Sequence, residues 1–217
     1  MEVARIDEGL WRWTVPHPDW TPEEDGLDAS YRDVGCVYLE APDAIVLIDP
    51  LVEHGPEGDR FWRALDRDVE RVGAPVSVVL TSRWHVRNAG EVRDRYAGAQ
   101  VLVPAGFAHE VDLPGLRVVE PGAPLPGGIE LLPTSRPGQV VVWVPGHRTL
   151  VPGDVLLGAP GGRLRLLPPG WLADPAHMGP LRAALRAMCD LPVERVLVSH
   201  GAPVLRDGRA ALLAALG

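Results

Sequence analysis

A polar turn in the first half of the chain carries residue types from which a chemical site can be built. The turn reads Thr81-Ser82-Arg83-Trp84-His85-Val86-Arg87 and joins an apolar strand predicted at 76–80 to a helix predicted at 87–96. Imidazole and carboxylate groups serve as metal ligands and as general acids or bases, and His85 is the only such group in this turn. Because its neighbours are poor zinc ligands, the turn by itself does not make a metal site.

Two further candidates follow apolar segments in the second half of the chain. Asp154 comes shortly after a strand predicted at 149–151, and His200 follows a strand predicted at 195–198. A buried carboxylate needs a partner, and a histidine taken alone is more often a hydrogen-bonded structural residue than a catalyst. The chemistry of both residues therefore depends on what the fold brings next to them.

Alternating strand and helix patterns predict the elements that must hold these residues. Turn residues between two apolar runs predict a hairpin of 35–39 and 44–48, and helical spacing predicts a helix at 58–72. Asp174 and Pro175 are a good N-cap and first-turn pair for a helix at 175–189. The other predicted elements are strands at 3–6, 10–15, 100–103, 129–132 and 139–144, an irregular stretch at 105–128 and a closing helix at 207–216. Strands followed by helices, twice over, predict an α/β sandwich of two mixed sheets with helices outside.

Length, charge and cysteine content narrow the class of protein. The 217 residues suffice for one sizeable core, so a single domain over 1–217 is expected. A net charge of −8 argues against nucleic acid and against an anionic membrane surface as partners. Cys36 and Cys189 show no pairing spacing, and the chain shows neither a signal peptide nor a segment long enough to span a bilayer. A cytoplasmic location is therefore expected, while the oligomeric state is left open.

The polar turn resembles the metal-binding motif of the metallo-β-lactamase-fold superfamily, Thr-His-x-His-x-Asp-His-x-Gly-Gly. Thr81 and Gly90 match the motif. Its ligand positions are occupied by Ser82, Trp84, Val86 and Arg87.

Four other segments resemble the same family and occur in its order. Leu47–Pro50 is similar to the strand that ends in aspartate, here Asp49. Thr134–Gly138 is similar to the Gly-His-Thr-Pro-Gly loop, with Ser135 where the ligand histidine would stand. The segment 150–154 is similar to the strand that delivers the bridging aspartate, and 198–201 to the strand that delivers the last histidine; both residues are present. The resemblance covers nearly the whole chain and implies a metallo-β-lactamase-like αββα four-layer sandwich.

The resemblance also implies that most of the family's metal ligands have been lost. Only Asp154 and His200 keep a ligand type at a ligand position. Catalytic zinc usually takes three protein ligands, and a two-metal site needs more. We therefore expect no dinuclear zinc, no cofactor, and none of the metal-bound hydroxide with which the family attacks esters and amides.

Three functions remain open at this point, and the sequence names no substrate for any of them. The first is a hydrolase relative with a degenerate metal site, whose polar pocket of Arg87, Asp154 and His200 either binds a small anionic or ester-like ligand or carries out slow acid–base chemistry without metal. The second is a mononuclear metallo-hydrolase with a single divalent metal on His85, Asp154 and His200. The third is a non-catalytic scaffold or binding protein in which Trp84 fills the pocket.

Individual roles follow from these positions. Arg87 is expected to form an ion pair with Asp154 in place of the lost metal. His85 lies one residue after a ligand position, which directs its side chain away from the site unless the local register shifts. Trp84 is either a plug or an aromatic wall for a flat ligand. The remaining candidates for substrate binding are Ser82, Ser135 and Asp49. His17, His109 and His177 are expected on the surface, and His147 at the far tip of a hairpin.

Overall fold

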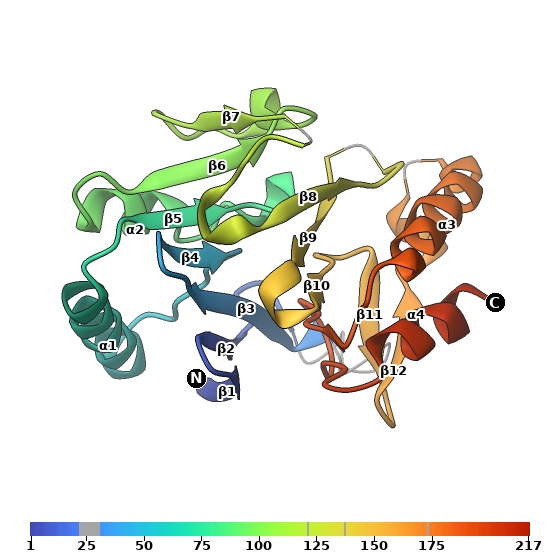
Figure 1. The fold of residues 1–217 in the computed structure, drawn as a ribbon, viewed down its shortest axis with the longest axis horizontal. Coiled ribbons are helices and arrows are strands. Elements are labelled where there is room, and N and C mark those ends of the chain that lie inside the picture. The colour runs from blue at the N-terminus through green and yellow to red at the C-terminus, as the bar shows by residue number, and fades with distance from the viewer. Residues whose placement is uncertain (22–30, 121, 137, 173) are drawn as a thin grey trace.

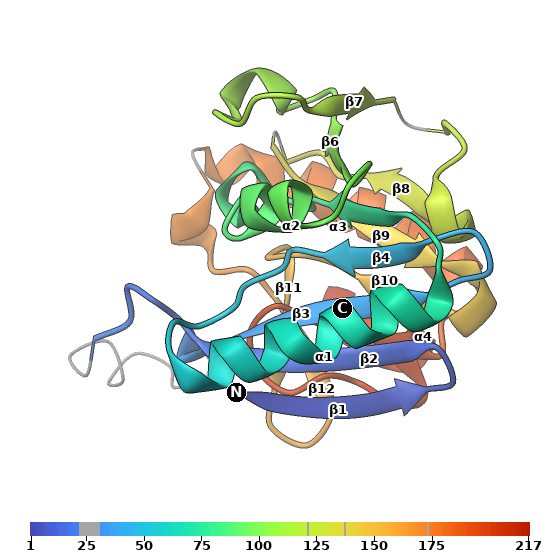
Figure 2. The same ribbon diagram turned by 90° about the vertical axis from the view of Figure 1, so that its left-hand side faces the viewer.

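Two β-sheets pack face to face, and each carries helices on its outer side (Figures 1 and 2). The computed structural model describes residues 1–21, 31–120, 122–136, 138–172 and 174–217. Helices α1 (Pro56–Val72) and α2 (Ala89–Arg95) cover one outer face, and α3 (Met178–Ala187) and α4 (Gly208–Leu216) cover the other. This arrangement confirms the predicted αββα sandwich.

The larger sheet has the strand order β1-β2-β3-β4-β5-β6-β7. Its first four strands pair antiparallel, and β4 to β7 pair parallel, so the sheet is mixed as expected. The strands are β1 (Glu2–Asp7), β2 (Leu10–Pro16), β3 (Asp33–Glu40), β4 (Ile45–Ile48), β5 (Val76–Val79), β6 (Gln100–Pro104) and β7 (Arg117–Val119).

The smaller sheet has the order β13-β10-β9-β8 and is mixed as well, because β10 pairs parallel with β13 and antiparallel with β9. A separate ribbon of β11 and β12 lies on the same side of the molecule (Figure 1). The strands are β8 (Glu130–Pro133), β9 (Val140–Val144), β10 (Thr149–Val151), β11 (Leu156–Ala159), β12 (Arg163–Leu166) and β13 (Arg195–Val196).

Three apolar layers hold the sandwich together, because the central strands are buried on both faces. In β9, Val140, Val142 and Val144 pack between the sheets, whereas Val141 and Trp143 face α3 and α4. This alternation is the two-residue period of a strand. A third layer joins α1 and α2 to the outer face of the larger sheet.

The departures from the predicted elements lie where local signals are weak. Strand β7 falls inside the stretch expected to be irregular, and the ribbon β11–β12 was not predicted. The helix expected at 87–96 begins at Ala89, because the 3₁₀ turn η3 (Arg83–His85) precedes it. The helix expected at 175–189 is α3 flanked by 3₁₀ turns. Among the described residues, further 3₁₀ turns are η4 (Ala108–Glu110), η5 (Pro126–Gly128), η6 (Pro145–His147), η7 (Pro169–Trp171), η8 (Pro175–His177) and η9 (Met188–Asp190).

Candidate functional site

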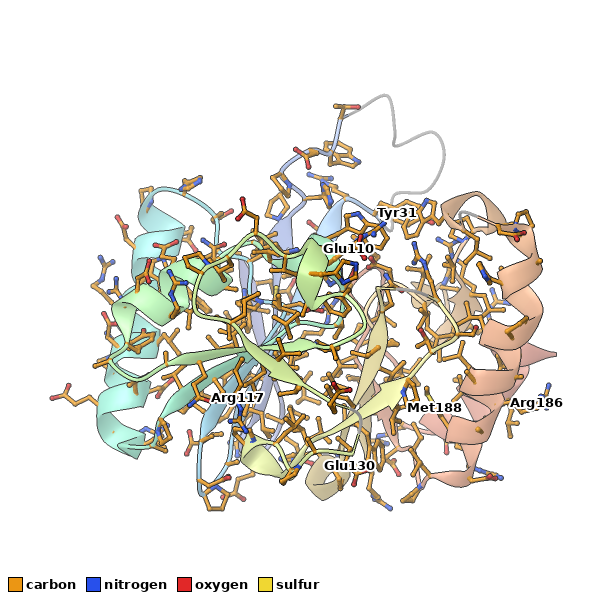
Figure 3. The ribbon with its side chains drawn as sticks, turned by 90° about the horizontal axis from the view of Figure 1, so that it is seen from above. Tyr31, Glu110, Arg117, Glu130, Arg186 and Met188 are labelled. Carbon is orange, nitrogen blue, oxygen red and sulfur yellow. The ribbon has the colours of Figure 1, made fainter. Side chains whose placement is uncertain are left out.

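The polar candidates meet at one end of the sandwich, where strands from both sheets stop. Asp49 follows β4, Thr81 follows β5, Asp154 follows β10 and His200 follows β13. Two isolated bridges, Val34 with His200 and Ser82 with Gln139, join these strand ends across the sheets. Figure 3 shows Tyr31 and Glu110 at this end and Glu130 at the opposite end. We call Asp49, Thr81, His85, Asp154 and His200 the polar cluster.

Asp49 anchors the polar turn to the larger sheet. It is buried, its Oδ1 accepts a hydrogen bond of 2.8 Å from the Thr81 backbone N–H, and its Oδ2 accepts one from the Thr81 hydroxyl. Its φ of +52° lies in the left-handed region, which an aspartate tolerates better than most residues. The turn that delivers Asp154 lies close to Thr81, because a Cβ at Gly153 would come within 2.5 Å of the Thr81 hydroxyl oxygen.

His85 lies between two carboxylates. Its Nδ1 is 2.8 Å from Asp49 Oδ2, and its Nε2 is 3.1 Å from Asp154 Oδ2. Burial and the nearby Arg87 lower the pKa of His85, but Asp154 and Asp49 outweigh them and raise it to about 9. At neutral pH the ring is therefore an imidazolium that donates to both carboxylates.

Asp154 connects His85 to His200. Its Oδ2 also accepts a 3.3 Å hydrogen bond from the Gln139 amide, and its Oδ1 lies 3.7 Å from His200 Nε2. Burial alone would raise the pKa of Asp154, but the charge and hydrogen bond of His85 hold it well below its usual range. Burial lowers the pKa of His200 to about 4, more than Asp154 raises it. The cluster thus combines a charged His85, a charged Asp154 and a neutral His200 at pH 7.

Aromatic side chains that the sequence did not single out surround His200. The ring of Tyr31 lies 5.6 Å from the His200 ring, that of His17 6.1 Å and that of Trp171 6.4 Å. His17, expected at the surface, is half-buried and its ring faces His200. His17 and Tyr31 lie between β2 and β3, and Trp171 lies far along the chain after β12, so no local pattern could have found this group.

The backbone around His200 is held by a buried arginine on β2. The Arg12 guanidinium donates to the carbonyl oxygens of Val198 at 3.2 Å and of Gly201 at 3.3 Å. Gly201 has a φ of +83°, and a Cβ there would lie 2.6 Å from the Gly158 carbonyl oxygen. A larger residue at 201 would therefore displace either His200 or β11.

The ion pair expected between Arg87 and Asp154 is wrong. Within the described part of the chain the two residues form no ion pair, and Arg87 donates to the Asp49 carbonyl oxygen at 3.3 Å. The carboxylate of Asp154 is neutralised by His85 instead. The expectation that the His85 side chain points away from the site is also wrong. The 3₁₀ turn η3 places its ring inside the site, and the residue is 2% exposed.

Trp84 lies largely at the surface and does not fill a pocket. Its side chain is 51% exposed, so the plug expected from the sequence is wrong. The guanidinium groups of Arg83 and Arg136 lie 4.3 Å and 5.1 Å from its ring centroid. Trp84 is therefore an exposed ring between two cations, an arrangement compatible with an aromatic wall.

The other residues proposed for substrate binding differ in exposure. Ser82 is fully buried and its hydroxyl accepts from the Trp84 N–H at 3.3 Å, while Asp49 is engaged by Thr81 and His85. Both side chains are buried and hold the polar turn in place, and their contact with a substrate stays a prediction. Ser135 has a buried hydroxyl without a hydrogen-bond partner in the described structure.

The side chains of the polar cluster do not fit the metal centre that the resemblance implies. Among the residues that the structure describes, no three or more His, Cys, Asp or Glu side chains are grouped so as to hold a metal ion. Both ring nitrogens of His85 contact carboxylates, which leaves neither nitrogen free to bind a metal ion.

The same described residues include no helix both long and apolar enough to cross a membrane.

The comparisons with known proteins agree on the fold. The model of the metallo-beta-lactamase superfamily matches residues 74–200, which include β5, the polar turn and His200. A metallo-beta-lactamase from Pontibacter korlensis is 18% identical, with 99% of this chain and 98% of that chain covered and a TM-score of 0.63. FIM-1 from Pseudomonas aeruginosa, in its mono-zinc form, is 15% identical, with 99% and 94% covered and a TM-score of 0.67. A metallo-beta-lactamase family protein from Thermus thermophilus is 16% identical, with 97% and 79% covered and a TM-score of 0.63. No curated protein matches the sequence.

Proposed function

Because the chain belongs to the metallo-beta-lactamase superfamily, we propose that it is a hydrolase relative whose metal centre is replaced by the His85 imidazolium. In this proposal the polar cluster forms the floor of a pocket for a small ligand. The first of the three functions considered from the sequence is thus retained, with His85 in the role that was expected of Arg87.

The observation that carries the proposal is the position of His85 between two buried carboxylates. Asp49 and Asp154 are 1% and 8% exposed, so each negative charge needs a partner inside the protein. His85 reaches both with its two ring nitrogens, at 2.8 Å and 3.1 Å. A single imidazolium therefore contacts both carboxylates and offsets one of their two negative charges, where the family would use a cation of higher charge.

His200 is the residue of the cluster best placed to contact a ligand. It is neutral at pH 7, since its pKa is lowered to about 4, and its Nδ1 has no hydrogen-bond partner among the described residues. A base with so low a pKa accepts a proton only weakly, because general catalysis is most efficient near the working pH. The arrangement therefore favours binding over fast proton transfer, and any hydrolysis by this His–Asp pair is slow.

The two other functions make different demands on the same residues. A mononuclear enzyme on His85, Asp154 and His200 requires His85 to give up one of its carboxylate partners. The scaffold function was based on a pocket filled by Trp84, but Trp84 lies at the surface. Both therefore rank below the proposed function.

Elemental analysis tests the proposal directly. The protein is expressed in medium supplemented with zinc, iron and manganese, and purified without chelator or a metal-binding tag. We expect less than stoichiometric metal, in the native protein and equally in the His85→Gln variant. One or more ions per chain that survive dialysis and disappear in His85→Gln would establish the mononuclear enzyme instead.

A ligand screen by protein-observed NMR then separates the pocket from the scaffold. Small anionic and ester-like compounds should shift the ring signals of His200 in the native protein, and His200→Ala should lose that binding while remaining folded. His109→Ala is the matched control, because the His109 side chain is 76% exposed. If no compound in the screen binds near His200, the scaffold function is the better account.

A further inference from the structure

A cavity lies between helix α1 and the outer face of strands β1 to β3. Figure 2 shows α1 crossing the outer side of this part of the larger sheet. The volume of the cavity is about 310 Å³. None of the residues that line it belongs to the polar cluster, so the cavity is distinct from the site proposed above.

Aromatic side chains make up much of the cavity wall. Trp11 and Trp13 come from β2, Tyr38 from β3 and Phe61 from α1. The rings form two pairs: the Trp11 and Tyr38 rings lie edge to face with centroids 5.2 Å apart, and the Trp13 and Phe61 centroids are 5.0 Å apart. Val3 extends the apolar wall and is itself 59% exposed. Such a wall favours an aromatic ligand, because paired rings are more stable than their buried area alone accounts for.

The buried polar groups of this wall already have partners. The Trp13 indole N–H donates to the Leu51 carbonyl oxygen at 2.8 Å, and the Tyr38 hydroxyl donates to Glu40 Oε2 at 3.3 Å. Among the described residues, none that lines the cavity has a buried polar atom without a hydrogen-bond partner. The wall therefore requires neither a donor nor an acceptor from a ligand, and an apolar body satisfies it.

The charges around the cavity balance. Two carboxylates and two guanidinium groups line it, those of Glu57, Asp68, Arg60 and Arg67. Each carboxylate has a cation beside it, at 3.7 Å for Glu57 and Arg60 and at 3.1 Å for Asp68 and Arg71. The amino group of Met1 is likewise 3.5 Å from Glu53. Because these charges are balanced and paired, they give neither an anion nor a cation an advantage.

The volume limits the size of the ligand. About 310 Å³ is at the lower end of the ~300–1,000 Å³ of pockets for drug-sized ligands, so the occupant is small. We infer that this cavity binds a small, uncharged compound with two fused aromatic rings. The binding does not depend on the proposed function, because it uses none of the side chains of the polar cluster.

The probe for the test is 2-naphthalenemethanol, an uncharged alcohol with two fused aromatic rings. A protein-observed NMR titration at neutral pH should give saturable binding of one molecule per chain, with the largest shifts in β1, β2 and α1. The anion 2-naphthoate and the cation 2-naphthylmethylammonium carry the same rings and should bind no more tightly. Tighter binding of either ion than of the alcohol would overturn the inference.

Variants localise the binding to the cavity. Ala64→Phe places a ring in the space beside α1 and should weaken binding at least ten-fold. Phe61→Leu keeps an apolar side chain but removes one ring of the wall, and should weaken binding about two- to ten-fold, the range of one aromatic pair. Ala183→Phe is the matched control, because Ala183 is exposed on α3.

Circular dichroism checks that each variant is folded, and Phe61→Leu carries the test if Ala64→Phe is not. Absence of saturable binding refutes the inference. Full affinity in a folded Ala64→Phe or, in its place, Phe61→Leu refutes it as well, because the compound then binds elsewhere.

Discussion

The substitution His85→Gln removes the only positive charge that, among the described residues, contacts both the Asp49 and the Asp154 carboxylates. Glutamine is similar in length and still offers an amide donor, so the main change is the loss of the imidazolium. In the native protein the pKa of His85 is raised from 6.5 to about 9. At ~1.4 kcal/mol per pKa unit, this rise corresponds to roughly 3 kcal/mol of folding free energy. Breaking a buried ion pair by removing one partner costs a similar ~3–5 kcal/mol. Solvent screening reduces neither figure much, because the side chain is buried.

The same argument fixes how stability depends on pH. A pKa that is higher in the folded state stabilises the protein fully below the unfolded pKa, here 6.5. The contribution then falls as the pH rises and is lost above about 9, where the folded ring gives up its proton. The native protein should therefore lose roughly 3 kcal/mol between about pH 6 and about pH 10 that His85→Gln does not lose.

Urea unfolding followed by tryptophan fluorescence, with chelator present, measures this difference at a series of pH values. His109→Gln is the control, because the His109 side chain is 76% exposed. The native protein and the control should show the same loss of stability at alkaline pH, and His85→Gln should be less stable at pH 7 with a flatter profile. The reasoning fails if His85→Gln unfolds at the same urea concentration as the native protein at pH 7. It also fails if the alkaline loss persists in that variant.

Three further substitutions test other parts of the site in the same urea assay. Arg87→Ala should cost only about 1 kcal/mol, because the hydrogen bond of its guanidinium is to the Asp49 carbonyl; a loss near that of a buried ion pair would restore Asp154 as its partner. Gly201→Ala should destabilise by ~1–3 kcal/mol, since its φ is +83° and the new Cβ would meet the Gly158 carbonyl; an unchanged midpoint would contradict this. Trp84→Ala should cost less than about 1 kcal/mol, the value of an exposed cation–π contact, whereas a larger loss would indicate a packed plug.

Much of the fold could be predicted from the sequence because its strands and helices have strong local periodicity. The apolar runs of β4, β5 and β9 are long enough to mark strands buried on both faces, and the spacing in α1 marks an amphipathic helix. Strand β7 and the ribbon β11–β12 escaped prediction because they are not continuous apolar runs: β7 and β12 contain arginines, and β11 contains Gly158. Short strands owe their conformation to pairing with a neighbour, which a local pattern does not record.

The sequence by itself identified Asp49, His85, Asp154 and His200 as candidates, and the tertiary structure decided how they are paired and which side chains surround them. The residue order places Ser82, Trp84 and Ser135 where the resemblance implies metal ligands, and Asp154 and His200 where it implies an aspartate and a histidine. The partner of Asp154 is not visible in that order, because η3 rotates His85 inward by an amount that sequence position does not specify. Charge balance requires only some cation beside two buried carboxylates. By sequence position alone, either Arg87 or His85 could supply this cation. Only the packing of the polar turn against β4 and β10 selects His85.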